Sequence, residues 1–204
     1  MPVTISAAVE GPTDEAVVTK LIAHVGALAG PVYGKNGKPH LRQHIGGYNN
    51  AARHSPWIVL VDLDHDADCA PPLRNEWLPQ PAPLLCFRVV VRAVEAWLLA
   101  DAEALSSFLG VARTRVPNQP EALEDPKAVM VNLARQSRRR DIRIDMAPRE
   151  GSGRPVGPAY ASRLIEFVSG YWRPDVAAAN ADSLTRTIRC LRRIAETVNA
   201  QQSL

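Results

Sequence analysis

The feature that most constrains the fold is an uninterrupted apolar run, residues 57–61, followed by acids at alternate positions, Asp62, Asp64, Asp66 and Asp68. An apolar run of this length predicts a strand buried on both faces, as in a parallel sheet, where ligands bind at the carboxyl ends of the strands. Side chains two apart on an extended chain point the same way, so Asp62 and Asp64 are expected to face one point. Their repulsion, which no nearby Lys or Arg is expected to neutralise, favours a hard divalent cation, Mg²⁺ or Mn²⁺.

Three other interpretations of the acidic run differ in what they require of the sequence. A Ca²⁺-binding EF-hand loop beginning at Asp62 would need Gly at its sixth position and Glu at its twelfth, where Ala67 and Leu73 stand, so it is excluded. A phosphatase of the haloacid dehalogenase type, with Asp62 as nucleophile, stays open, although Asp66 stands where that family usually has Thr or Val. A solvated acidic loop after a core strand stays open as well.

The N-terminal residues predict a strand, a tight turn and a helix. Residues 3–9 are apolar and free of breakers, and Glu10 follows them directly. A Gly-Pro pair then turns the chain, and a helix with Asp14 in its first turn is expected to run to residue 30. An acid that closes a buried strand needs a partner or a functional reason, which makes Glu10 a candidate site residue.

The remaining pattern alternates strands and helices. This alternation predicts an α/β fold, with a mainly parallel four-stranded sheet flanked by helices and an α-helical C-terminal extension. We expect two domains, residues 1–101 and 102–204. The other expected elements are a loop at 31–40 with a short strand at 32–33, helices at 41–54, 71–78, 102–111, 126–137, 160–172 and 182–200, and a strand at 84–91.

Charge is distributed unevenly between the two halves. Residues 1–101 hold 8 Lys and Arg against 10 Asp and Glu, whereas residues 102–204 hold 16 against 11. An acidic half beside a basic half suits metal chemistry on a polyanion, nucleic acid foremost. Residues 141–158, rich in Gly and Pro, are expected to form a mobile loop, and phosphate contacts are predicted in and just before it. A solvated loop is the alternative, and the arginines concerned are Arg138, Arg139, Arg140, Arg149 and Arg154.

Cysteine and hydropathy patterns limit the class of protein. Three cysteines at wide spacing suggest neither a disulfide framework nor a zinc site. No segment is long and apolar enough for a membrane span, and the N-terminus lacks the basic and apolar regions of a secretory signal. A cytoplasmic protein without membrane contact is therefore expected, and its oligomeric state stays open.

Two motifs together resemble the Toprim (topoisomerase–primase) domain, the metal-dependent catalytic fold of topoisomerases, primases and OLD-type nucleases. They are the strand end Glu10-Gly11-Pro12-Thr13-Asp14 and the later strand end Asp62-Leu63-Asp64. The resemblance covers the first half of the chain. Three further segments resemble small uncharacterised bacterial Toprim-like proteins: residues 91–101 (VRAVEAWLLAD), Gly157-Pro158-Ala159-Tyr160 and Ser183-Leu184-Thr185-Arg186.

The resemblance implies roles for single residues. Glu10 would be catalytic, as a metal ligand or general acid/base, and Asp62 and Asp64 would be catalytic metal ligands. Asp14 matches the second acid of the turn in nucleases of this group, and Glu95 corresponds to the acid that helps to hold a second metal. Simple helix acids are the alternative for the last two. The expected metal ligands are Glu10, Asp14, Asp62, Asp64, Asp66 and Glu95.

The same resemblance implies a Mg²⁺- or Mn²⁺-dependent nuclease that cleaves phosphodiester bonds of DNA or RNA, with a role in phage defence. The sequence contains neither the ATPase segment of OLD proteins nor the strand-passage domains and tyrosine of topoisomerases. A separate ATPase is therefore a candidate partner. Two other functions stay open: a phosphohydrolase acting on small phosphate esters through Asp62, and a non-enzymatic module that binds a metal or a protein.

Overall fold

A computed structural model describes residues 2–202 of the chain, and the side chains of residues 2–200. The chain divides into two compact units, Met1–Val91 with Ser183–Leu204, and Arg92–Asp182. The first unit contains the sheet and the second is helical. These units differ from the predicted domains 1–101 and 102–204, because the last helix folds with the sheet. The domain boundaries themselves stay a prediction.

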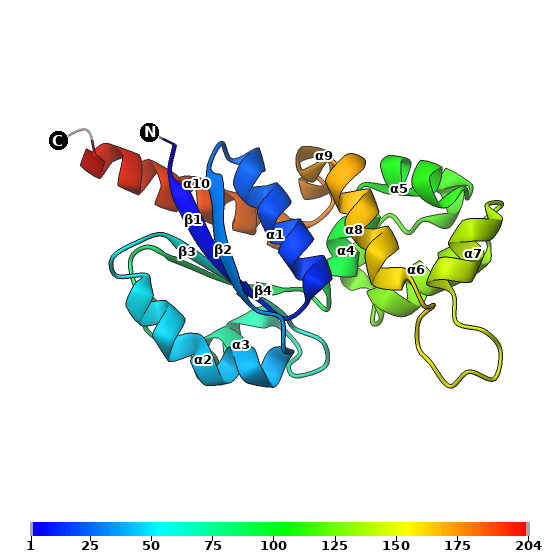
Figure 1. Cartoon of the computed structure of the whole chain (residues 1–204), viewed down its shortest axis with the longest axis horizontal. Coiled ribbons are helices and arrows are strands. Elements are labelled where there is room, and N and C mark those ends of the chain that lie inside the picture. The colour runs from blue at the N-terminus through cyan, green and yellow to red at the C-terminus, as the bar shows by residue number, and fades with distance from the viewer. Residues whose placement is uncertain (1, 203–204) are drawn as a thin grey trace. The chain divides into compact units, whose positions relative to one another are not determined.

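The first unit is built on a four-stranded, all-parallel sheet in the order β2-β1-β3-β4 (Figure 1). The predicted α/β class and the parallel sheet are thereby confirmed. β1 pairs with both β2 and β3, and β3 pairs with both β1 and β4, so β1 and β3 are the central strands. The bounds are β1 (Thr4–Val9), β2 (Leu28–Gly34), β3 (Trp57–Asp62) and β4 (Leu85–Val90).

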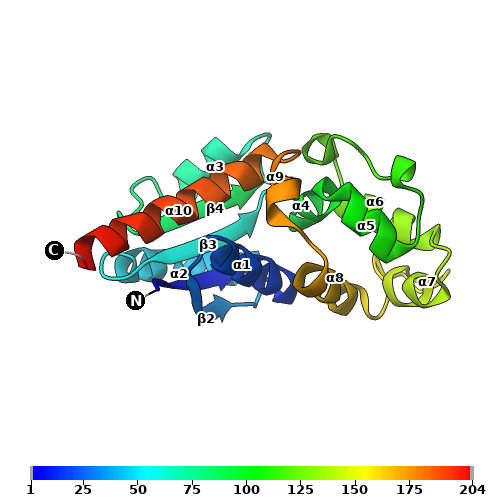
Figure 2. The same ribbon diagram turned by 90° about the horizontal axis from the view of Figure 1, so that it is seen from above.

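Four helices cover the two faces of this sheet: α1 (Pro12–His24), α2 (Lys38–Ala51), α3 (Ala70–Trp77) and α10 (Asp182–Gln202). Figures 1 and 2 show α1 and α10 on one face and α2 and α3 on the other. The strand order explains this arrangement. The connection from β1 to β2 runs in one direction across the sheet and the later connections run in the other, and right-handed crossovers then place their helices on opposite faces.

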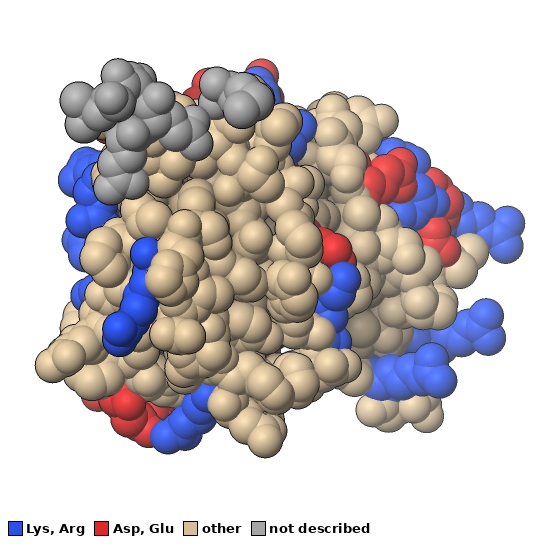
Figure 3. Space-filling model, turned by 60° about the vertical axis from the view of Figure 1, so that its left-hand side comes forward, with Lys and Arg blue, Asp and Glu red and all other residues tan. Residues whose placement is uncertain are grey.

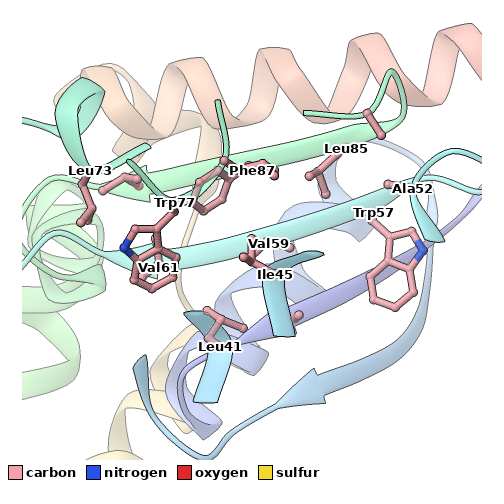
Figure 4. Packing of buried hydrophobic residues seen from close by; sticks show 14 of the residues in the cluster. Leu41, Ile45, Ala52, Trp57, Val59, Val61, Leu73, Trp77, Leu85 and Phe87 are labelled. Carbon is pink, nitrogen blue, oxygen red and sulfur yellow. The ribbon is translucent and has the colours of Figure 1, made fainter. Parts of the chain in front are cut away.

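The face under α2 and α3 carries a hydrophobic cluster (Figure 4). Alternate residues of β3 contribute to it because successive side chains on a strand point to opposite faces. Ile58 and Leu60, the residues in between, are buried toward the other face. The predicted burial of β3 on both sides is therefore confirmed. The cluster includes Leu41, Ile45, Trp57, Val59, Val61, Leu73, Trp77, Leu85, Phe87 and Val89.

The second unit is a set of short helices around α4 (Val94–Ala100), whose residues are all buried. Trp97 of α4 and Trp172 are among its largest fully buried side chains, and the Trp172 indole donates a hydrogen bond to the Trp97 carbonyl (3.3 Å). No helix in residues 2–202 combines the length and the apolar character needed to cross a membrane. The other elements are α5 (Ala102–Leu109), η1 (Arg113–Arg115), η2 (Pro120–Ala122), α6 (Pro126–Arg135), α7 (Arg140–Met146), α8 (Tyr160–Gly170) and α9 (Pro174–Ala178).

Three predicted segments differ from the structure. The loop expected at 31–40 instead holds the end of β2 and the start of α2. The first helix ends at His24 rather than residue 30, because Gly26 turns the chain with φ +78° and the following residues pair with β1 as an edge strand, where a proline is tolerated. Residues 141–158 are not one loop. Their first part belongs to α7, which buries Ile142 and Met146, four residues apart on one helical face.

Candidate functional site

The candidate site lies where the two central strands end. Glu10 directly follows β1, and Asp62 is the last residue of the neighbouring strand β3. From here the chain leaves β1 toward one edge of the sheet and leaves β3 toward the other, with α1 and α3 on opposite faces. Such a switch point in a parallel sheet opens a crevice at the carboxyl ends of the strands, where ligands bind.

Glu10 reaches across this point to the neighbouring strand. Its Oε1 accepts a hydrogen bond from the backbone N–H of Asp62 (2.8 Å). Burial raises the pKa of the half-buried Glu10 carboxyl above its usual value, and the repulsion of Asp64 and Asp66 adds to this effect. The hydrogen bond from Asp62 and the charge of Lys38 oppose the rise only in part. The surroundings of Glu10 therefore favour a proton or a cation beside its carboxyl.

Lys38 provides a cation from a different part of the chain. Its Nζ donates to Asp64 Oδ2 (2.6 Å) and Asp66 Oδ2 (2.8 Å), and its side chain is only 16% exposed. Burial lowers the pKa of Lys38, but the hydrogen bonds with the two aspartates and the charge of Glu10 outweigh burial and leave the pKa raised. The acidic run does lack basic residues of its own. The idea that no nearby Lys or Arg neutralises it is wrong, because Lys38 does so through the fold.

The turn before α2 fixes Lys38 in this place. The Lys35 N–H donates to the Val9 carbonyl (2.8 Å) and the Gly37 N–H to the Glu10 carbonyl (3.1 Å), so the turn is bound to the end of β1. Gly34, at φ +85°, lies so close to the Val9 backbone that a Cβ would collide with it. A cation in the first turn of a helix opposes the helix dipole, but the sequence predicted a loop at this position and so gave no such signal for Lys38.

The backbone after Asp62 does not continue as a strand. Leu63 still donates to the Val90 carbonyl (2.9 Å), but Asp64 has φ +49° and the Asp66 N–H closes a turn on the Leu63 carbonyl (3.2 Å). We expected Asp62 and Asp64 to face one point because the chain between them would be extended. The chain is not extended at Asp64, so that reason does not hold. Asp64 is brought to the site by a left-handed turn, a conformation that Asp tolerates better than most residues.

Asp14, the acid of the Gly-Pro turn, is buried in the first turn of α1. Its Oδ2 accepts the N–H of Gly11 (2.8 Å), which closes the start of the helix. This contact agrees with the helix-start interpretation. A role of Asp14 as a metal ligand stays a prediction.

Glu95 lies in the second unit, at the start of α4, and is 3% exposed. Its carboxyl accepts a hydrogen bond from the Tyr160 hydroxyl (3.0 Å), and Lys127 Nζ lies 4.0 Å from the same oxygen. Burial raises the pKa of Tyr160 far above its usual range, and the Glu95 charge adds to this. Glu95 thus has a fixed partner inside its own unit, and its role as a ligand for a second metal stays a prediction.

Asp101, at the end of the same segment, is fully buried and also has a structural role. Its carboxyl caps α5 through the Ala104 N–H (3.4 Å) and accepts hydrogen bonds from the Arg173 backbone N–H (3.0 Å), Nε (3.0 Å) and Nη2 (2.7 Å). The Glu-Ala-Trp-Leu-Leu-Ala-Asp segment therefore holds the helices of the second unit together. Its partner Tyr160 comes from the Gly-Pro-Ala-Tyr segment, to which the sequence assigned no chemistry.

The five predicted phosphate-binding arginines are used differently from one another. Arg138, Arg139 and Arg140 are all exposed, but the Arg139 guanidinium also donates to the Phe108 carbonyl (3.0 Å) and to Asp141 (2.7 Å). Arg149 and Arg154 line one pocket of about 440 Å³ in the loop after α7. On the face shown in Figure 3, Lys and Arg form separate groups rather than a continuous basic surface. Phosphate binding by these arginines stays a prediction.

The donor chemistry at the ends of β1 and β3 suits a divalent cation. In residues 2–202, no three His, Cys, Asp or Glu side chains are arranged as a finished metal site. Glu10, Asp62, Asp64 and Asp66 nevertheless provide the carboxylate oxygens that Mg²⁺ and Mn²⁺ prefer, and the acids already hold one cation, the Lys38 ammonium. The residues fit a divalent ion. The convergence of Glu10, Asp62 and Asp64 on one ion stays a prediction.

Comparison with known proteins does not place this chain in a family. No protein-family model matches it, and neither the curated proteins nor the solved structures contain a significant match. The interpretation of the site therefore rests on its residues and their geometry.

Proposed function

We propose that the chain is a Toprim-like, Mg²⁺-dependent nuclease that cleaves phosphodiester bonds of DNA or RNA. One observation carries the proposal: Glu10, directly after β1, accepts a hydrogen bond from Asp62 at the end of β3, at the switch point of a parallel sheet. Asp64 and Asp66 lie beside this pair through their shared partner Lys38. An acid at the first strand end and two acids at a neighbouring strand end are the pattern on which the Toprim resemblance depends.

The residues at the ends of β1 and β3 and Lys38 would have different roles in the reaction. Glu10, Asp62, Asp64 and Asp66 would hold the ion, which, when bound, polarises a phosphate oxygen and lowers the pKa of water. If Glu10 does not bind the ion, it is suited to exchange a proton instead, since its burial raises its pKa. Lys38, which pairs with Asp64 and Asp66, would lie next to the bound ion, where its ammonium could donate to a phosphate oxygen.

Cleavage of three substrates tests the proposal. Plasmid, single-stranded DNA and RNA are incubated with the purified protein in Mg²⁺, in Mn²⁺ and in EDTA. We expect cleavage of at least one substrate only with metal, and a loss of at least about 100-fold in Glu10→Gln and Asp62→Asn, by analogy with the loss of a catalytic acid or base. The matched control is Asp68→Asn, which replaces an exposed acid of the same run and should retain activity. Cleavage that survives EDTA, or none with any substrate, would contradict the proposal.

The alternatives predict other outcomes in the same samples. A phosphohydrolase would release phosphate from small esters and depend on Asp62 as nucleophile, while a non-enzymatic module would bind metal and cleave nothing. The contact between Glu10 and the Asp62 backbone favours the nuclease, because it brings the first strand end into the site. The same proposal includes a partner ATPase, which can be tested by adding candidate ATPases to the cleavage assay. It also includes a role in phage defence.

A further inference from the structure

Helix α2 carries two histidines on one face. His40 and His44 are four residues apart, which places their side chains one above the other on a helix. Their rings lie against each other, with centroids 4.2 Å apart and planes tilted by 35°. His40 is half-buried and His44 is exposed, so the pair can be reached from solvent.

A hydrogen bond fixes the tautomer of the His44 ring. Its Nδ1 lies 2.8 Å from the His40 backbone carbonyl, and a carbonyl oxygen can only accept a hydrogen bond. Nδ1 therefore carries the hydrogen, and in the neutral ring the free electron pair is on Nε2. A histidine that binds a metal almost always donates its other ring N–H to a carbonyl, a carboxylate or water. His44 thus already makes the contact that orients a metal-binding histidine.

The surroundings of the histidine pair leave room for a cation. Lys38 and Arg42 of the same helix stand two residues before His40 and His44, and two residues turn a side chain by about 200° around a helix. The two positive charges therefore point to another side, where acids of other segments pair with them. A Cβ at Gly47, three residues after His44, would meet nothing within 4 Å, so the space beside the pair is open.

The donors and their spacing select the kind of ion. Two histidines at i and i+4 on a helix bind the same zinc ion in the His-Glu-x-x-His motif of metalloproteases. With zinc–nitrogen bonds of about 2.0–2.1 Å, two imidazoles on one ion have ring centres about 4.5–5 Å apart, so the separation of 4.2 Å needs only a small movement. Imidazole suits Zn²⁺, Cu²⁺ and Ni²⁺, whereas Mg²⁺ and Mn²⁺ prefer oxygen ligands.

We propose that His40 and His44 bind one Zn²⁺ ion or a similar transition-metal ion, through Nε2 of His44 and a ring nitrogen of His40. In residues 2–202 no third His, Cys, Asp or Glu joins the pair, so water or a group of a ligand completes the coordination. The site uses none of the acids at the strand ends. It is therefore an addition to the proposed nuclease function and does not depend on it.

Nuclear magnetic resonance of the histidine ring nitrogens tests the proposal. Zn²⁺ is added to ¹⁵N-labelled protein at pH 7.5 in excess Mg²⁺, which fills oxygen sites without competing for imidazole. The ring signals are identified by their absence in His40→Gln and His44→Gln. We expect Nδ1 of His44 to be the protonated nitrogen before Zn²⁺ is added. Zn²⁺ should then shift the signals of His40 and His44 together and leave those of His54, an exposed single histidine, in place.

The variants measure how much the second histidine contributes. The Zn²⁺ affinity read from the His40 ring should be at least about tenfold weaker in His44→Gln than in the parent, since one of two ligands is lost. The His44 ring should report the same loss in His40→Gln. The matched control is His54→Gln, which should change the affinity less than about twofold.

Three results would overturn the inference: a neutral His44 ring with its hydrogen on Nε2, a pair of rings that Zn²⁺ leaves unmoved, or a His40 ring that binds Zn²⁺ as tightly in His44→Gln as in the parent. The first two are read from the parent protein and do not depend on the folding of a variant. None of the three involves cleavage of nucleic acid. The histidine site and the nuclease function therefore stand or fail separately.

Discussion

The molecule holds two groups of acids that differ in burial and in how their charge is satisfied. In the first unit, Asp64 and Asp66 are exposed and share Lys38, while Glu10 is half-buried and burial raises its pKa. In the second unit, Glu95 and Asp101 are almost fully buried, yet each has its own partner, Tyr160 and Arg173. Burial alone therefore does not mark a functional acid. Acids that gather around one cation at the end of a central strand are the better candidates.

Substitutions should separate these groups by stability. An acid that holds helices together is expected to cost stability when it is removed. By contrast, removing the charge of an acid that neighbouring acids repel should lower the stability only slightly or raise it.

The largest loss is expected from Asp101→Ala. It removes the cap of α5 and the fully buried carboxylate that accepts from the Arg173 backbone N–H and Nε, so the free energy of unfolding should fall by about 2–4 kcal/mol. Urea unfolding measures the change. Glu103→Ala is the matched control, because Glu103 pairs with the same Arg173 (2.8 Å) but is 80% exposed, and it should cost under about 0.5 kcal/mol. Equal losses in the two variants would mean that the burial of Asp101 has no special effect.

A smaller loss is expected from Tyr160→Phe. The substitution removes only the hydroxyl that donates to Glu95, and leaving that buried carboxyl without this donor should cost about 1–3 kcal/mol. Tyr171→Phe, at a residue 54% exposed, should have almost no effect. Both are compared by urea unfolding, with Mn²⁺ binding measured alongside. If Tyr160→Phe leaves stability intact but weakens Mn²⁺ binding, Glu95 belongs with the metal ligands and the contrast between the groups fails.

The smallest effect is expected from Glu10→Gln, and it should have the opposite sign. The pKa of Glu10 is raised above its ordinary 4.5 in the folded protein, so ionising this group costs folding free energy. The cost is absent below pH 4.5, grows as pH rises through the folded pKa, and persists above it. Gln can still accept the Asp62 N–H but never ionises. The stability of the variant relative to the parent should therefore improve between pH 4 and pH 7.5, and a pH-independent difference would contradict the expectation.

Much of the sheet could be predicted from the sequence because its signals are local. The apolar residues before Asp62 and those before Glu10 each predict a strand from local sequence alone. Pairing of the two strands in the parallel sheet then brings their ends together. β2 was largely missed because it is an edge strand. Its first residue, Leu28, is 53% exposed, and Gly30 and Pro31 are typical of turns, so only pairing with β1 makes the segment a strand.

The electrostatics of the site could not be read from the sequence. Lys38 lies 26 residues before Asp64 and reaches it only because the β2–α2 turn is bound to the backbone of Val9 and Glu10. The structural role of Glu95 was hidden for the same reason, since its partner Tyr160 is 65 residues away. Pairings at such distances depend on tertiary structure, which no local pattern specifies.

The central claim is that the acids at the ends of β1 and β3 bind a divalent cation, and direct Mn²⁺ binding tests it most directly. Free Mn²⁺ is followed by electron paramagnetic resonance as protein is added, for the parent, for Asp62→Asn with Asp64→Asn, and for Asp68→Asn. We expect saturable binding by the parent and by Asp68→Asn, and at least about tenfold weaker binding by the double variant, since loss of charged oxygen ligands lowers affinity for a hard cation. Binding by the double variant as tight as that of the parent would place the ion elsewhere and contradict the claim.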